Sequence, residues 1–86
     1  MPEICRFFEI VIYMYFNEHN PPHFHIKYHD FRAQMAIATL EIMEGELPPK
    51  QLRLVTDWAR LHQTELLKNW NSLQETGTFG KITPLT

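Results

Sequence analysis

Four of the five histidines in this sequence fall within eleven residues: His19, His23, His25 and His29. Imidazole binds divalent transition metals and also serves as a general acid or base near neutral pH. On a β-strand, His23 and His25 would lie on one face, roughly 6–7 Å apart at Cβ, where both rings can reach one ion. His19 precedes them in a turn and can fold back toward that face. Three such histidines can hold zinc and leave a fourth position for water.

The same histidines also fit two other roles. On the polar face of a half-buried strand they can be hydrogen-bonding surface residues, and His19 can cap the turn at residues 20–22. In a metal-free catalytic site, one imidazole would be the base and another the acid, while Lys27 or Arg32 held a phosphate. No serine or cysteine nucleophile lies nearby in the sequence. The candidate metal ligands are therefore His19, His23 and His25, and the candidate binding residues are these three with Lys27 and Arg32.

Length and composition limit the class of protein. Eighty-six residues, of which 44% are hydrophobic and 21% charged, predict one small globular domain over residues 1–86. The net charge of −2 leaves nucleic-acid binding possible but unsupported. A single cysteine and a start unlike a signal peptide predict a cytoplasmic protein. No apolar run approaches the roughly 20 residues of a membrane span, so we expect no membrane association.

The first half of the chain has the pattern of β-strands. Residues 7–16 are apolar on both alternating faces, which is typical of a central strand. The next strand alternates strictly, with His23, His25 and Lys27 on its polar face. A two-residue turn at His29 and Asp30 follows it. Three strands and a candidate short fourth are thus predicted at residues 7–16, 23–28, 31–38 and 40–43.

The second half has a helical period. Apolar residues recur every three to five positions over residues 49–74, which predicts one long amphipathic helix. Trp58 and Trp70 lie in its apolar stripe and are expected to be buried. The predicted fold is an α+β domain, with a small antiparallel sheet of three to four strands packed on one long C-terminal helix. Because one helix covers only one face of the sheet, we expect a homo-oligomer or a small protein partner to cover the other.

The string His-Asn-Pro-Pro-His-Phe-His at residues 19–25 resembles a motif of a bacterial family of domains of unknown function, family 4160. The resemblance continues through Trp58-Ala59 and Asn69-Trp70 to the C-terminal residues. It implies a compact bacterial protein without an established activity, often encoded beside a family 2442 protein in pairs that look like toxin and antitoxin. Relatives usually carry glycine at the position of His29, so we interpret His29 as a turn residue outside the shared site.

Two functions from different classes follow. We favour a protein-interaction module of a two-gene toxin–antitoxin-like or regulatory system, with a family 2442 protein as the partner that the resemblance implies. The alternative is a small metal-dependent hydrolase or ribonuclease that uses His19, His23 and His25, with a divalent metal such as zinc as cofactor. Whether the protein is an enzyme stays open at this point.

Overall fold

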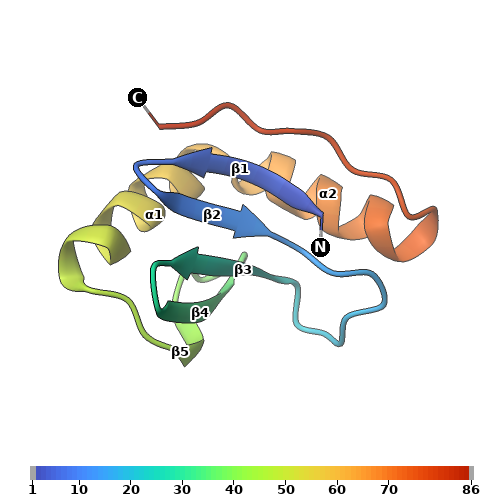
Figure 1. Ribbon diagram of the computed structural model, residues 1–86. Coiled ribbons are helices and arrows are strands. Elements are labelled where there is room, and N and C mark those ends of the chain that lie inside the picture. The colour runs from blue at the N-terminus through green and yellow to red at the C-terminus, as the bar shows by residue number, and fades with distance from the viewer. Residues whose placement is uncertain (1, 86) are drawn as a thin grey trace.

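A computed structural model describes residues 2–85 as a five-stranded antiparallel sheet and two helices (Figure 1). The strands lie side by side in chain order: β1 (Glu3–Phe7), β2 (Ile10–Tyr13), β3 (His23–Tyr28), β4 (Phe31–Ala36) and β5 (Ile42–Gly45). The helices α1 (Pro49–Leu61) and α2 (Gln63–Glu75) lie on one face of this sheet (Figure 1). The predicted α+β class is confirmed, but the sheet has more strands than expected.

The single strand predicted over residues 7–16 is wrong, because β1 ends at Phe7 and β2 begins at Ile10. Phe8 and Glu9 form the turn between them, with φ of 48° and 64°. Two-residue turns of this kind normally use Asn and Gly. Phe8 and Glu9 are neither, so the sequence pattern did not indicate a turn here. The second face of β2 carries Val11 and Tyr13, which are only 7% and 6% exposed. At β2, the apolar part of the face that was expected to be uncovered is therefore buried within the chain.

The hairpin of β3 and β4 follows the prediction closely. β3 has the predicted bounds, and His29 has φ 51°, as expected of a residue in a tight two-residue turn. The chain then turns into β5, which ends at Gly45 with φ +80°. A Cβ added there would lie 2.1 Å from the Arg32 carbonyl oxygen, so only glycine allows this close approach.

The single helix predicted over residues 49–74 is also wrong, because the chain breaks at His62 into α1 and α2. His62 has φ −126° and ψ 23°, and its side-chain Nδ1 lies 2.6 Å from Glu65 Oε1. No proline or glycine lies at this break, and the apolar residues continue at helical spacing across it. The sequence therefore predicted one uninterrupted helix. Within residues 2–85, no helix has the length and apolar character needed to cross a membrane.

The core lies between the sheet and the helices, and it contains both tryptophans, as predicted. Trp58 is fully buried and Trp70 is 4% exposed. The C-terminal segment runs beside β1 and closes this core (Figure 1). Its Ile82 N–H donates to the carbonyl oxygen of Ile4 over 3.1 Å. The indole N–H of Trp58 donates to the carbonyl oxygen of Thr83 over 2.8 Å, so the tail is bonded to both the sheet edge and α1.

Candidate functional site

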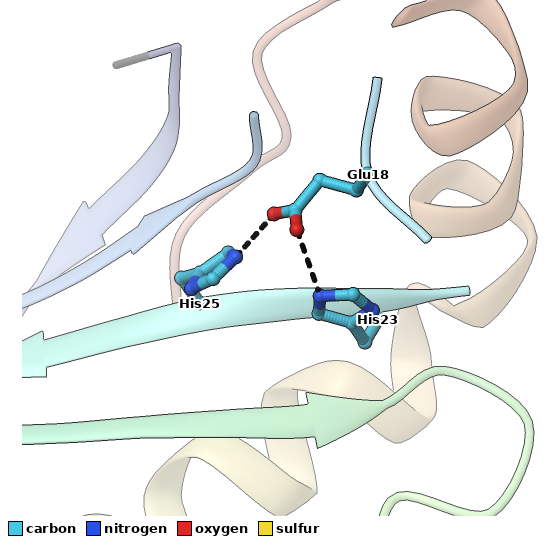
Figure 2. A group of neighbouring side chains, drawn as sticks. All are labelled: Glu18, His23 and His25. Carbon is cyan, nitrogen blue, oxygen red and sulfur yellow. Dashed lines mark hydrogen bonds and ion pairs between the residues drawn. The ribbon is translucent and has the colours of Figure 1, made fainter. Parts of the chain in front are cut away.

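Glu18, His23 and His25 come together where the loop of residues 14–22 folds back over β3 (Figure 2). One potential ligand atom from each side chain lies within 4.8 Å of the others. The two carboxylate oxygens of Glu18 each point to one ring: Oε1 contacts Nε2 of His25, and Oε2 lies 3.4 Å from Nε2 of His23. The group therefore has two imidazoles and one carboxylate converging on a common point.

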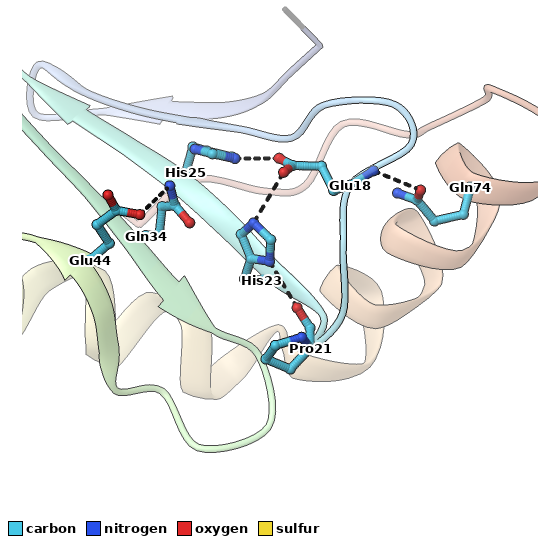
Figure 3. Close-up of polar contacts among 7 residues, drawn as sticks. All are labelled: Glu18, Pro21, His23, His25, Gln34, Glu44 and Gln74. Atoms are coloured by element: carbon cyan, nitrogen blue, oxygen red, sulfur yellow. Dashed lines mark hydrogen bonds and ion pairs between the residues drawn. The ribbon is translucent and has the colours of Figure 1, made fainter.

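Strand and loop contacts position these three side chains. His23 and His25 share a face because they are two residues apart on β3. Glu18 is anchored through its backbone, since its N–H donates to Oε1 of Gln74 on α2 over 3.1 Å (Figure 3). The carbonyl oxygen of Pro21 lies 2.8 Å from Nδ1 of His23. The loop is thus tied to both the strand and the second helix.

The hydrogen bond to Pro21 sets the tautomer of His23. A carbonyl oxygen can only accept, so Nδ1 of His23 carries the proton. In the neutral ring Nε2 then has a lone pair, which points toward the Glu18 carboxylate. This Nε2 is buried, and no atom of residues 2–85 forms a hydrogen bond with it. Two facing lone pairs repel each other, and a buried group left unsatisfied costs about 1–3 kcal/mol.

Aromatic side chains surround the two imidazoles. Tyr13 stacks on His25 with ring centroids 5.1 Å apart, and Tyr15 meets the same ring edge-on at 4.7 Å. Trp70 packs against His23 with centroids 5.2 Å apart. His23 and His25 are consequently 5% and 9% exposed, which is more buried than the polar face of a half-buried strand predicts. Burial raises the pKa of the Tyr13 hydroxyl, so this group stays protonated and neutral beside His25.

The structure gathers only part of the set proposed from the sequence. His23 and His25 converge, but His19 is exposed and lies outside the ligand group, where Glu18 takes the third place. Neighbouring loop residues point in different directions, so only one of them can face β3. Lys27 and Arg32 are both exposed and lie opposite each other on β3 and β4.

Two residues of α2 that shape the site had no local signal in the sequence. Gln74 holds the loop from 56 positions away, and Trp70 forms one wall. Glu18 did have a signal, because a histidine that binds a metal usually needs a carboxylate nearby and Glu18 lies in the same loop.

The sheet surface next to His25 is hollowed, with a volume of about 210 Å³. This hollow lies over β2, β3, β4 and β5. It connects the ligand group to the exposed Arg32, because both His25 and Arg32 line it. The complete lining is Tyr13, His25, Arg32, Ala33, Gln34, Glu44 and Gly45.

Fold and site together define a small α+β domain that carries a two-histidine, one-carboxylate group at the edge of an open hollow. The chain belongs to the family described as Domain of unknown function (DUF4160), which matches residues 10–71. The matched range contains Glu18, His23 and His25 as well as Lys27 and Arg32. No curated protein and no solved structure matches the chain.

Proposed function

We propose that this protein is a metal-dependent hydrolase in which Glu18, His23 and His25 bind one divalent transition-metal ion, with zinc as the expected ion. The observation that carries the proposal is the buried Nε2 of His23. It has no hydrogen bond within residues 2–85 and faces a carboxylate oxygen 3.4 Å away. With His23 neutral, a cation between these two atoms would replace the repulsion of their lone pairs by two favourable contacts.

The ligand types and spacing suit zinc. Two histidines and one glutamate form a known ligand set of catalytic zinc sites. Ligands at about 2.0–2.1 Å in a tetrahedron lie about 3.3 Å apart, close to the 3.4 Å between Glu18 and His23. The Nδ1–H of His23 also donates to the Pro21 carbonyl, as the second nitrogen of a metal-bound histidine usually does. Binding of one ion would draw together ligand atoms that now lie within 4.8 Å of one another.

Three protein ligands leave a fourth position for water, which gives the site its chemistry. Water bound to zinc in a dry site has a pKa of about 7, so hydroxide is available at neutral pH. An ion held by Glu18, His23 and His25 would supply this hydroxide as the nucleophile of a hydrolysis. Its oxygen would bond to the electrophilic centre as the bond to the leaving group broke, and the leaving group would take up the proton that the water lost. This chemistry agrees with the second function inferred from the sequence, a small metal-dependent hydrolase or ribonuclease.

Metal analysis of the protein purified without a histidine tag tests this proposal. We expect about one zinc per chain, because the set supplies the three ligands of one catalytic zinc. We expect His23→Gln, His25→Gln and Glu18→Gln to weaken zinc binding by at least about 100-fold, since each removes a direct ligand. His19→Gln is the matched control in the same loop and should bind zinc like the wild type. Wild-type protein that binds no zinc, or ligand variants that bind it unchanged, would overturn the proposal.

A second function, binding to a small protein partner, is favoured by Phe8. Its side chain is 56% exposed while its backbone has φ 48°. A bulky residue in this conformation costs about 1–2 kcal/mol, and strain of this kind is typical of functional positions. We propose that Phe8 contacts a protein partner in a two-gene, toxin–antitoxin-like or regulatory pair. The resemblance implies that this partner is a family 2442 protein encoded nearby. If the protein associates with itself instead, the experiment below will show it.

Sedimentation of the protein alone and mixed with the family 2442 protein encoded beside it tests the second function. Asparagine accepts positive φ better than phenylalanine, so Phe8→Asn should keep the stability or raise it by about 1 kcal/mol. Loss of the aromatic contact should weaken the complex at least about tenfold. Leu61→Gln, which changes a side chain 71% exposed on α1, is the control. A strict monomer that forms no complex, or a complex indifferent to Phe8, would exclude this function.

A further inference from the structure

Two cationic side chains lie close together where Arg32 lines the hollow. Lys27 and Arg32 lie directly opposite each other on β3 and β4. Like charges in cross-strand register repel and destabilise a sheet. Neither side chain forms an ion pair with any carboxylate of residues 2–85. An anionic ligand over this part of the sheet would relieve the repulsion.

The guanidinium of Arg32 is held in place by the backbone. Its Nη1 donates to the carbonyl oxygens of His29 and Phe31, each over 3.0 Å. A guanidinium has five N–H donors, so the Nε and Nη2 side keeps its donors for another acceptor. This pair of donors matches two oxygens of a phosphate or carboxylate group. Arg32 is thus oriented before a ligand arrives, which lowers the entropy lost on binding.

Glu44 is the one carboxylate in the lining of the hollow, and it is already engaged. Its Oε2 accepts a hydrogen bond from Nε2 of Gln34 over 3.3 Å (Figure 3). Glu44 therefore sits with Gln34 and leaves Arg32 without an acidic partner. With a divalent ion on Glu18, His23 and His25, the positive charges around the hollow outnumber the negative ones.

We propose that the hollow receives the phosphate group of the substrate, so that the enzyme hydrolyses phosphate monoesters. This inference rests on the proposed metal-dependent hydrolase. Arg32 donates to two phosphate oxygens, and Lys27 adds a second positive charge. His25 lies opposite Gln34 in the register, and Arg32 is two residues further along β4, so the two residues are diagonal neighbours on one face of the sheet. Both line the hollow, so a phosphate bound there would lie between them.

Size and charge favour phosphate over a peptide carboxylate. A hollow of about 210 Å³ is smaller than most sites for whole organic ligands. It suits one compact group, with the rest of the ester lying over the open sheet. Two cationic side chains beside a divalent ion fit a group that carries two negative charges better than a monoanion.

Titration of the cobalt-loaded protein with inorganic phosphate tests this inference. Binding of phosphate to the metal changes the visible absorption of cobalt, which gives a dissociation constant. We expect Arg32→Gln to weaken phosphate binding at least about tenfold, because a charge-assisted bidentate contact is lost. Lys27→Gln should weaken it severalfold, and Glu44→Gln should strengthen it, since repulsion is removed. All three variants should bind cobalt as tightly as the wild type.

Arg6→Gln is the matched control, because Arg6 on β1 is already paired with Glu3 over 2.8 Å. It should leave phosphate binding unchanged. Wild-type protein that does not take up cobalt overturns the proposed hydrolase and this inference with it. Cobalt uptake with equal phosphate affinity in wild type and Arg32→Gln overturns the phosphate site alone. Acetate bound as tightly as phosphate would likewise contradict the phosphate-ester assignment.

Discussion

Replacing Trp58 by alanine should lower the free energy of unfolding by about 3–5 kcal/mol. The side chain is fully buried, and its ring packs against Phe7 and Phe24 with centroids 5.5 Å and 6.2 Å away. Alanine leaves a cavity between the sheet and α1, where backbone elements on both sides limit collapse. It also removes the donor to the Thr83 carbonyl, which loosens the C-terminal tail. Urea denaturation followed by circular dichroism gives the change.

The control for this loss is Leu61→Ala on the same helix. Leu61 is 71% exposed, so its removal should change stability by less than about 0.5 kcal/mol. A domain of this size has a total stability of about 5–10 kcal/mol, so Trp58→Ala should be close to unfolding at 37 °C. A loss below about 1 kcal/mol for Trp58→Ala would contradict the packing described above.

The parts of the fold that the sequence predicted have strong local patterns. β3 has six residues of strict alternation, two prolines before it and a turn after it, and both its ends are as predicted. The burial of Trp58 and Trp70 follows from their place in an apolar helical stripe. In these segments local preference and tertiary packing favour the same structure.

The errors lie where packing overrides local preference. Phe8 and Glu9 have no tendency toward positive φ, yet the pairing of β1 with β2 forces both into it. His62 could continue a helix, but the chain bends there so that α1 and α2 can both place apolar residues on the sheet. No residue type at these positions signals a turn or a break.

In the candidate site, too, some features follow from the local sequence and others from tertiary contacts. The period of two along a strand predicts that His23 and His25 share a face. It does not predict whether His19 or Glu18 turns inward, because that depends on how the loop is anchored. The anchor is Gln74, on a helix whose approach to the loop is a tertiary contact. The third member of the group therefore follows from the structure and not from the spacing of histidines.

Adding zinc to the metal-free protein should raise its melting temperature by about 10–20 °C. An ion that binds only the folded state stabilises it by about 2.7 kcal/mol at 100 times its dissociation constant. For a domain of this size, each kcal/mol shifts the melting temperature by about 4–8 °C. Thermal unfolding followed by circular dichroism, with and without zinc, measures the shift. His19→Gln should show the full shift, since its side chain lies outside the ligand group.

His23→Phe separates a metal site from a structural ion pair. Phenylalanine keeps the ring against Trp70 and removes the unsatisfied Nε2, although the Pro21 carbonyl loses its donor. These effects oppose each other, so the metal-free variant should stay within about 1 kcal/mol of the wild type. The zinc-induced shift should disappear. If Glu18 instead serves to pair with a protonated His23, zinc would not stabilise the wild type, and His23→Phe would destabilise it because the part-buried carboxylate would lose one of its two imidazole partners.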